Sequence, residues 1–128
     1  MKDLKELTDY MRKFSDARDW VQFHSPKKLS MALSVEASEI VECFQWLTEE
    51  QSYSLNQEQK DAVMDEIADV QLYLVRLADQ LGVDIGVDIG VDIGVDIGVA
   101  VSNKIQKNET KYPTEKVKGS SKKYSDYE

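Results

Sequence analysis

The sequence predicts an all-α protein, a four-helix bundle, on three observations. Apolar residues recur at helical spacing in four stretches, Gly and Pro are rare outside one repeat, and the connections are short. The 128 residues suffice for one domain and are too few for two. We therefore expect a single helical domain over residues 1–112, followed by a polar, basic tail over residues 113–128.

The first two helices are predicted from an apolar stripe and from a capping signal. The stripe indicates a helix over about residues 3–18, and a connection rich in aromatic residues follows. Ser25 and Pro26 fit an N-cap and a first-turn proline, whose missing N–H is not needed there. The second helix is therefore expected from Pro26 to about Leu47.

The third and fourth helices have signals of their own. Ser54 and Gln57 fit a capping box, so a helix should begin just after Ser54 and stop at Gly82. A fourth helix is expected over about residues 99–112, because Pro113 then ends it.

The connection between the last two helices contains four copies of Val-Asp-Ile-Gly, over residues 83–98. In a helix the glycines would each cost about 1 kcal/mol, whereas in a strand Val and Ile would face one way and Asp and Gly the other. The segment lacks the ligand spacing and terminal Glu of a calcium-binding loop. We interpret it as an expansion that lengthens one connection, and the sequence leaves its conformation open.

Composition argues against several classes of protein. No apolar run approaches the roughly 20 residues that span a bilayer, and the first residues lack the apolar segment of a signal peptide. The net charge of −8 argues against a nucleic-acid polymer as a partner. Cys43, the single cysteine, allows no internal disulfide and suits a reducing compartment. We expect a cytoplasmic protein that binds neither membranes nor nucleic acid.

Charge is unevenly distributed along the chain. Lys60 is the only base between Lys28 and Arg76, an interval that holds ten acids. From Lys104 onward the chain has seven lysines and four acids. An acidic middle and a basic end indicate a protein that holds a cation and an anion together.

Two pairs of carboxylates lie in the acidic interval. Glu36 and Glu39 are three residues apart on the second predicted helix, and Glu66 and Asp69 are three apart on the third. Residues at this spacing share a helix face, so like charges repel, and no base lies one turn away. The first pair also interrupts an otherwise uncharged run, residues 29–41, which should be largely buried. Antiparallel packing of the two helices would bring all four carboxylates into one pocket, where a hard divalent cation such as Mg²⁺ would neutralise them.

Other interpretations of these acids exist. They could be two solvated acidic helix faces, although the missing bases weigh against this. A ferritin-like di-iron site needs a Glu-x-x-His pair on two helices, and a zinc site needs several Cys or His ligands. The chain has one histidine, His24, and one cysteine, so both of these metal sites fail.

The pattern Glu36-x-x-Glu39 followed by Glu66-x-x-Asp69 resembles the metal signature of the MazG-like all-α nucleoside triphosphate pyrophosphohydrolases. The fuller likeness is to the dCTP pyrophosphatase branch of that family, and it covers nearly the whole chain outside the repeats. The fold it implies is the four-helix bundle of this all-α type. The other similar segments are Arg-Asp-Trp-Val-Gln-Phe-His at 18–24, Phe-Gln-Trp at 44–46, Asp-Glu-Ile-Ala-Asp-Val at 65–70, Tyr-Leu-Val at 73–75, Lys104 with Asn108, Lys-Tyr-Pro at 111–113 and Ser-Ser-Lys-Lys-Tyr at 120–124.

The resemblance implies hydrolysis of a (deoxy)nucleoside triphosphate between its α and β phosphates, giving the monophosphate and pyrophosphate. The candidate catalytic and Mg²⁺-binding residues are Glu36, Glu39, Glu66 and Asp69. Candidates for binding the nucleobase or substrate, with core packing as their alternative role, are Trp20, Phe23, His24, Trp46 and Tyr73. Candidates for contacting the β and γ phosphates, with a solvated basic face as the alternative, are Lys104, Asn108, Lys111, Tyr112, Lys122 and Tyr124.

The chain departs from the family pattern at three places. Many relatives have an additional Glu where this chain has Val35, and some dCTPase-like relatives have a histidine where it has Met11. The second difference puts strict cytosine preference in doubt. Relatives have one copy of the repeated connection, so about 12 residues look inserted before the fourth helix. A displaced fourth helix would misalign Lys104 and Asn108 and weaken activity.

We therefore expect a Mg²⁺-dependent nucleotide pyrophosphohydrolase that cleans the nucleotide pool. A homodimer or homotetramer is expected, because one thin bundle exposes much apolar surface and members of the family assemble in this way. Two alternatives stay open: a non-catalytic module that binds nucleotide or metal, and an acidic helical interaction protein without metal. The sequence also leaves open the preferred base and the carboxylate that accepts the proton of water.

Overall fold

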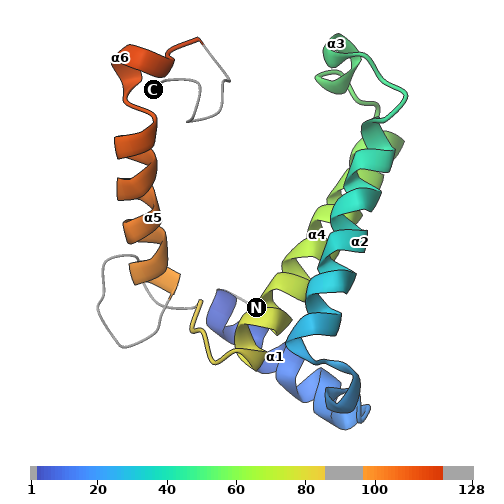
Figure 1. The fold of residues 1–128 in the computed structure, drawn as a ribbon. Helices are drawn as coiled ribbons and strands as arrows, with labels where there is room; N and C mark the ends of the chain where they lie inside the picture. The colour runs from blue at the N-terminus through green and yellow to red at the C-terminus, as the bar shows by residue number, and fades with distance from the viewer. Residues whose placement is uncertain (1–2, 86–96, 120–128) are drawn as a thin grey trace. The chain divides into compact units, whose positions relative to one another are not determined.

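The computed structural model describes residues 3–85 and 97–119, and every regular element among them is a helix (Figure 1). In chain order the elements are α1 Leu4–Ala17, the 3₁₀ turn η1 Val21–Phe23, α2 Pro26–Phe44, α3 Glu49–Ser52, α4 Gln57–Gln80, α5 Ile97–Lys111 and α6 Thr114–Val117. The chain separates into two compact units, residues 1–83 and residues 84–128. The predicted all-α class is confirmed, and each of the four long helices expected from the sequence is present.

The caps of α1 and α2 explain where both helices begin. The Asp3 carboxylate accepts the backbone N–H of Glu6 at 2.8 Å. The Ser25 hydroxyl accepts the backbone N–H of Lys28 at 3.2 Å, and a proline follows the cap as predicted. Each cap satisfies a first-turn donor that has no partner within its helix. α2 ends at Phe44, slightly before its predicted end.

The start of α4 differs from the prediction. The Asn56 side chain accepts the backbone N–H of Gln59 at 2.8 Å, and the Gln59 side chain accepts that of Asn56 at 2.9 Å. The predicted capping box of Ser54 and Gln57 is therefore wrong by two residues. Ser54 belongs to the preceding turn instead, because its backbone N–H donates to the carbonyl of Gln51. The short helix that this turn closes, α3, was not expected from the sequence.

α4 ends at Gln80, just before Gly82, as the sequence predicts. Gly82 has a φ of +69°, a left-handed conformation that a residue without Cβ adopts without strain. Its backbone N–H donates to the carbonyl of Asp79 at 3.1 Å, and that of Val83 donates to the carbonyl of Ala78 at 2.9 Å. This Schellman pattern satisfies the last carbonyls of the helix.

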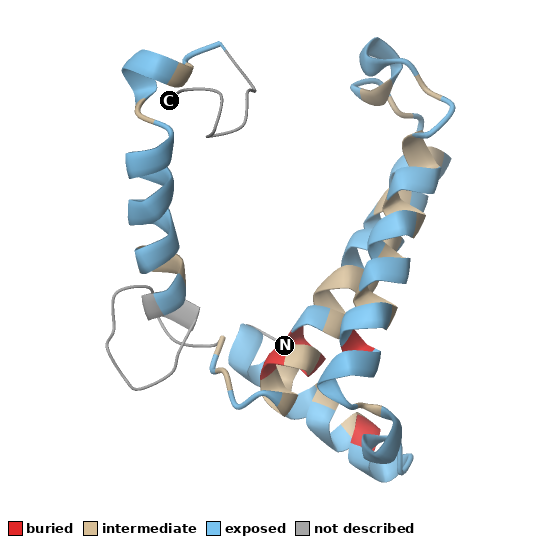
Figure 2. Ribbon diagram, in the orientation of Figure 1, coloured by how far each residue is buried: buried red, intermediate tan, exposed pale blue. Residues whose placement is uncertain are grey.

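In the first unit, α2 and α4 run side by side in opposite directions, and α1 packs on α4 (Figure 1). The buried segments in Figure 2 gather at the end of the α2–α4 pair beside α1. The buried apolar side chains are Leu29, Val75 and Ala78, and two polar side chains, Ser15 and Arg76, are buried with them. The core is therefore small and lies at one end of the unit.

The outer face of α2 is more exposed than expected. The prediction that the run 29–41 is largely buried is wrong: Met31 is 60% exposed, Val35 57% and Val41 63%. The physical reason is that, among the described helices, α2 packs extensively against α4 alone, and along one face. The opposite face keeps its apolar side chains in contact with solvent.

The second unit begins after Val83. α5 begins two residues before the predicted start of the fourth helix, and it ends one residue before the predicted end. Pro113 stands at the N-cap position of α6 and so separates the two helices. Most of the repeat, residues 86–96, lies outside the described residues, so its interpretation stays a prediction. Among the helices of residues 3–85 and 97–119, none is long and apolar enough to cross a membrane.

Candidate functional site

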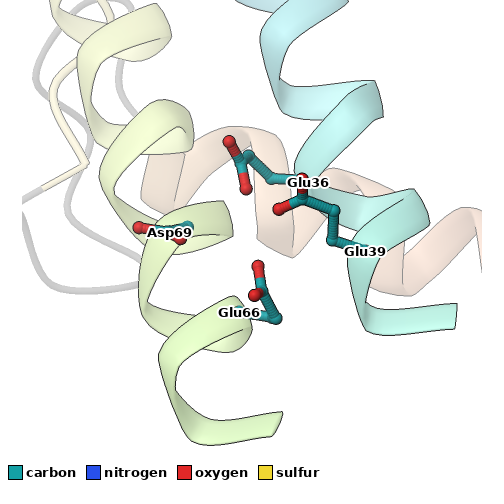
Figure 3. A group of neighbouring side chains, drawn as sticks. All are labelled: Glu36, Glu39, Glu66 and Asp69. Atoms are coloured by element: carbon teal, nitrogen blue, oxygen red, sulfur yellow. The ribbon is translucent and has the colours of Figure 1, made fainter. Parts of the chain in front are cut away.

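Four carboxylates face one another between α2 and α4. Glu36 and Glu39 project from α2, and Glu66 and Asp69 project from α4 (Figure 3). In each pair, the spacing of three residues puts both side chains on one helix face. One carboxylate oxygen from each residue lies within 4.8 Å of one from every other. The structure thus brings together all four acids that the sequence singles out as a group.

This carboxylate cluster carries negative charge that its surroundings do not balance. All four residues are half-buried. Oε2 of Glu36 and Oε2 of Glu66 are buried and have no hydrogen-bond partner among the described residues. In that same part of the chain, no ion pair reaches any of the four acids. A buried carboxylate oxygen without a partner is costly, so the cluster favours a proton or a cation between its members.

The ionisation of two members of the cluster is shifted accordingly. Hydrogen bonding to Glu39, burial and the negative charge of the other three carboxylates raise the pKa of Glu36 to about 7. Hydrogen bonding to Glu39, burial and neighbouring negative charges also raise the pKa of Glu66. Both glutamates therefore retain protons at pH values where ordinary glutamates have lost them, as expected of a site that attracts positive charge.

The donor set of the cluster fits a hard divalent cation. Such ions prefer oxygen ligands, and Mg²⁺ is commonly held by a few carboxylates together with substrate phosphates. The cluster offers four carboxylates, and two of its buried oxygens lack any other partner in the described part of the chain. The residues present therefore suit Mg²⁺ or an ion of similar chemistry.

A cavity of about 160 Å³ adjoins the carboxylate cluster. Asp69 belongs to both, because its side chain also lines the cavity. Phe14 meets the ring of Trp20 edge-on, with the ring centroids 5.7 Å apart. An aromatic cavity beside a charged cluster suits a ligand that has a flat ring and a charged group. The full set of lining residues is Met11, Phe14, Ser15, Trp20, His24, Asp69, Leu72, Tyr73 and Arg76.

Three of the five residues predicted to bind the nucleobase or substrate line this cavity: Trp20, His24 and Tyr73. Phe23 does not line it and is 55% exposed. Trp46 lies beyond the end of α2 and is 86% exposed. The structure does not bring these two residues to the cavity, and all five roles stay predictions.

A chain of hydrogen bonds holds the ring of His24. Arg76 Nε donates to His24 Nδ1 at 3.1 Å, and Arg76 Nη1 donates to Asp79 Oδ2 at 2.9 Å. Asp79 also accepts hydrogen bonds from Arg12, which hold the pKa of Asp79 below its usual value. Burial and then the charge of Arg76 lower the pKa of His24, so the ring is neutral near pH 7. Because Nδ1 accepts a hydrogen bond, the ring proton is on Nε2.

The predicted phosphate contacts that the structure describes lie in the second unit. Lys104, Asn108 and Tyr112 follow one another at intervals of four residues along α5 and just past its end, so they share one side of the helix. These three side chains and that of Lys111 are exposed. The two remaining candidates lie outside the described residues: Lys122 and Tyr124. All six assignments stay predictions.

Two buried cavity residues, Ser15 and Arg76, were not singled out from the sequence. Ser15 comes four residues after Met11, at a position where the apolar stripe of α1 would place an apolar residue. Arg76 comes seven residues after Asp69, so both lie on one face of α4. Two sequence signals could have found them. Ser15 is a polar residue on an apolar stripe, and Arg76 is a base two turns after an acid.

Known proteins resemble the chain over most of its length. The MazG-like family matches residues 31–90, the span that holds all four carboxylates. The chain is 34% identical over 125 residues to dCTP pyrophosphatase 1 of Mus musculus and 32% identical over 125 residues to that of Homo sapiens. Each match covers 96% of this chain, which spans 66% of the length of either relative, just under two thirds.

A solved structure is similar as well. A pyrophosphatase from Archaeoglobus fulgidus matches with a TM-score of 0.70 and 35% sequence identity, over 85% of this chain and 91% of that one. Sequence and fold thus agree over most of both chains. The chain belongs to the MazG-like family, as the pattern of its acids suggested.

Proposed function

We propose that the chain is a Mg²⁺-dependent hydrolase that cleaves a (deoxy)nucleoside triphosphate between its α and β phosphates, giving the monophosphate and pyrophosphate. The carboxylate cluster is the main support for the proposal. One oxygen of each of the four acids lies within 4.8 Å of the others, and two buried oxygens lack a hydrogen-bond partner among the described residues. Family membership supports the same class of reaction, because the matched relatives and the solved structure are named as pyrophosphatases.

In this mechanism, the four residues Glu36, Glu39, Glu66 and Asp69 would hold the ion. Bound Mg²⁺ would screen the phosphate charge, orient the triphosphate and help to activate water. A carboxylate that is not fully committed to the ion would accept the proton of the attacking water. The oxygen of that water forms a bond to phosphorus, the bridge between the α and β phosphates breaks, and pyrophosphate leaves.

The cavity beside the cluster positions the other end of the nucleotide. Trp20 and Tyr73 line it, and stacking of a base on an aromatic ring contributes about 1–3 kcal/mol. Asp69 lies at the junction of cavity and cluster. A nucleotide whose base occupies the cavity would therefore extend its phosphates toward the carboxylates.

We further propose a dCTP-like substrate and a role in cleaning the cytoplasmic nucleotide pool. The relatives from mouse and human are named for dCTP, which supports this substrate. Met11 lines the cavity where some relatives have a histidine, so the base preference of this chain depends on the other lining residues. The free thiol of Cys43 is compatible with a reducing compartment.

Assembly into a homodimer or homotetramer is also part of the proposal. α2 and α4 expose large apolar side chains, among them Met31, Val35, Met64 and Ile67, each more than half exposed. An apolar face of this kind is typical of an interface between subunits. Light scattering after gel filtration tests this directly, and a monomer at micromolar concentration would contradict it.

The reaction is tested by measuring pyrophosphate and orthophosphate released from the four dNTPs and 5-methyl-dCTP, with Mg²⁺ and with EDTA. We expect pyrophosphate only, only with Mg²⁺, and fastest with a cytosine nucleotide. Release of orthophosphate, or no release by the folded protein, would contradict the proposal. Glu36→Gln distinguishes an enzyme from a non-catalytic binding module: turnover is lost in the first case, and only affinity changes in the second.

A further inference from the structure

The size of the cavity indicates how much of a base it accepts. Its volume is about 160 Å³. An apolar protein cavity of about 150 Å³ binds benzene, a single six-membered ring. The cavity therefore matches one ring, as in a pyrimidine, more closely than the two fused rings of a purine. Its walls are largely apolar, so the polar groups among the lining residues determine which ring fits best.

Among the described residues, Ser15 is the buried polar side chain of this cavity that has no hydrogen-bond partner. Its side chain is 0% exposed, and Oγ has no hydrogen-bond partner among the described residues. Other hydroxyls on helices of this chain bond to a backbone carbonyl of the preceding turn: Thr8 donates to Leu4 at 2.7 Å, and Ser38 donates to Ser34 at 3.0 Å. Ser15 lacks this bond although it has the same helical setting, and it faces the cavity instead.

The neighbouring polar groups of the cavity are hydrogen-bond donors. Arg76 donates to His24 Nδ1, which leaves the His24 proton on Nε2 as a donor. Arg76 is itself 3% exposed and carries further N–H groups besides the two that bond to His24 and Asp79. The Ser15 hydroxyl can donate as well. The cavity thus offers several hydrogen-bond donors and few acceptors. The main acceptor is Asp69, where the cavity meets the carboxylate cluster.

We propose that Ser15 is a specificity-determining contact, whose hydroxyl donates a hydrogen bond to the nucleobase of the substrate beside a His24 ring that Arg76 positions. The inference rests on the proposed function, and it names the substrate as a pyrimidine nucleotide with adjacent acceptors. Cytosine has acceptors at O2 and N3, whereas thymine and uracil carry a proton on N3 that would face the fixed Nε2–H donor of His24. Cytosine nucleotides are therefore preferred over thymine nucleotides.

Ser15→Ala tests the contact through two readouts of opposite sign. Loss of one neutral hydrogen bond lowers kcat/KM for dCTP by about 3- to 10-fold, while kcat/KM for dTTP is unchanged. The melting temperature of the ligand-free protein stays the same or rises, because a buried hydroxyl without a partner is removed. Ser30→Ala is the matched control: Ser30 is exposed on α2 and outside the cavity, so both nucleotides are hydrolysed as before.

Arg76→Lys tests the positioning role. Lysine keeps the positive charge. It lacks the planar guanidinium, whose separate N–H groups bond to His24 Nδ1 and to Asp79 at the same time. The KM for dCTP rises about 3- to 10-fold relative to that for dTTP, while kcat for dCTP changes less than KM. A purely structural role would instead change the kinetic constants for dCTP and dTTP equally.

The outcome separates this inference from the proposed function. If the wild-type protein hydrolyses dCTP and Ser15→Ala leaves the ratio of dCTP to dTTP unchanged, the inference is overturned and the proposed function stands. If the wild-type protein hydrolyses neither, calorimetric titration with dCMP and dTMP decides. A preference for dCMP that Ser15→Ala reduces supports the contact, and equal affinities in both proteins overturn it.

Discussion

Two groups of charges along α4 differ in how they are balanced. Toward the end of the helix, Asp79 accepts hydrogen bonds from both Arg12 and Arg76. About three to four turns earlier, Glu66 and Asp69 face two more acids, and no ion pair reaches them within residues 3–85 and 97–119. The first arrangement is balanced within the chain, whereas the second has an excess of negative charge that an added cation would neutralise. We therefore interpret the unbalanced, half-buried charge as the proposed functional centre and the balanced charge as its structural support.

The largest expected effect comes from removing one charge of the carboxylate cluster. Glu66→Gln keeps the shape of the side chain but lowers pyrophosphate release by about 10³-fold, because a metal ion contributes several kcal/mol to such a transition state. The melting temperature without metal stays the same or rises, since repulsion is relieved. Glu42→Gln, an exposed change on α2 outside the cluster, is the control for both measurements. Equal activity of the two variants would contradict the metal site.

The balanced group should respond in the opposite way. Asp79→Asn leaves Arg76, which is 3% exposed, without its carboxylate and lowers the free energy of unfolding by about 3 kcal/mol. Asp9→Asn breaks the exposed pair with Arg12 and costs less than about 0.5 kcal/mol. Urea denaturation of both variants measures the difference. Similar midpoints would mean that Asp79 does not support the buried guanidinium.

Acid should weaken metal binding. The pKa of Glu36 is raised to about 7 and that of Glu66 is raised as well, so protons compete with the cation below pH 7. We expect the Mg²⁺ dissociation constant to rise by up to about 10-fold per pH unit from pH 7 downward. Calorimetric titration between pH 6 and pH 8 measures it, and a constant value over this range would contradict the competition.

Stability without metal should move in the opposite direction. A carboxyl whose pKa is raised on folding destabilises the folded state when ionised, and this cost disappears as pH falls from about 7 toward 4.5. The melting temperature of the wild-type protein should therefore approach that of Glu36→Gln as pH falls through this window. The comparison with Glu36→Gln cancels the opposing contribution of His24, whose pKa is lowered. Parallel curves would contradict the assignment.

A modest effect is expected at the start of α4, the helix that contributes to both groups of charges. Asn56→Ala removes the cap of α4 and should lower the free energy of unfolding by about 1 kcal/mol. Thr48→Ala removes the cap of α3, a four-residue helix with no buried residue, and should cost less. Thermal denaturation of the two variants makes the comparison. A larger effect at Thr48 would mean that α3 contributes more to stability than its exposure indicates.

Local patterns in the sequence predicted much of the fold and of the carboxylate cluster. Helical periodicity, the Ser25 cap and Gly82 located the ends of helices, and the spacing of three residues within each pair of acids placed both on one face. The cap of α4 was misplaced because two capping boxes overlap at residues 54–59, and the sequence alone does not show which one is used.

Contacts between segments distant in the chain were not predictable in the same way. The role of Arg76 depends on His24, 52 residues away, and on Asp79 being shared with Arg12, 67 residues away. The exposure of Val35 depends on whether α2 packs on one face or two, which periodicity does not determine. Residues whose importance comes from distant partners therefore emerged only with the structure.

The central claim, that unbalanced carboxylates form a cation site, is tested most directly by Mn²⁺ binding followed by electron paramagnetic resonance at pH 8. We expect the wild-type chain to bind Mn²⁺ and to release it on addition of Mg²⁺. The double variant Glu36→Gln, Glu66→Gln should bind at least about 100-fold more weakly, whereas Glu42→Gln should bind as the wild type does. Equal Mn²⁺ affinity in the double variant and the wild type would contradict the claim.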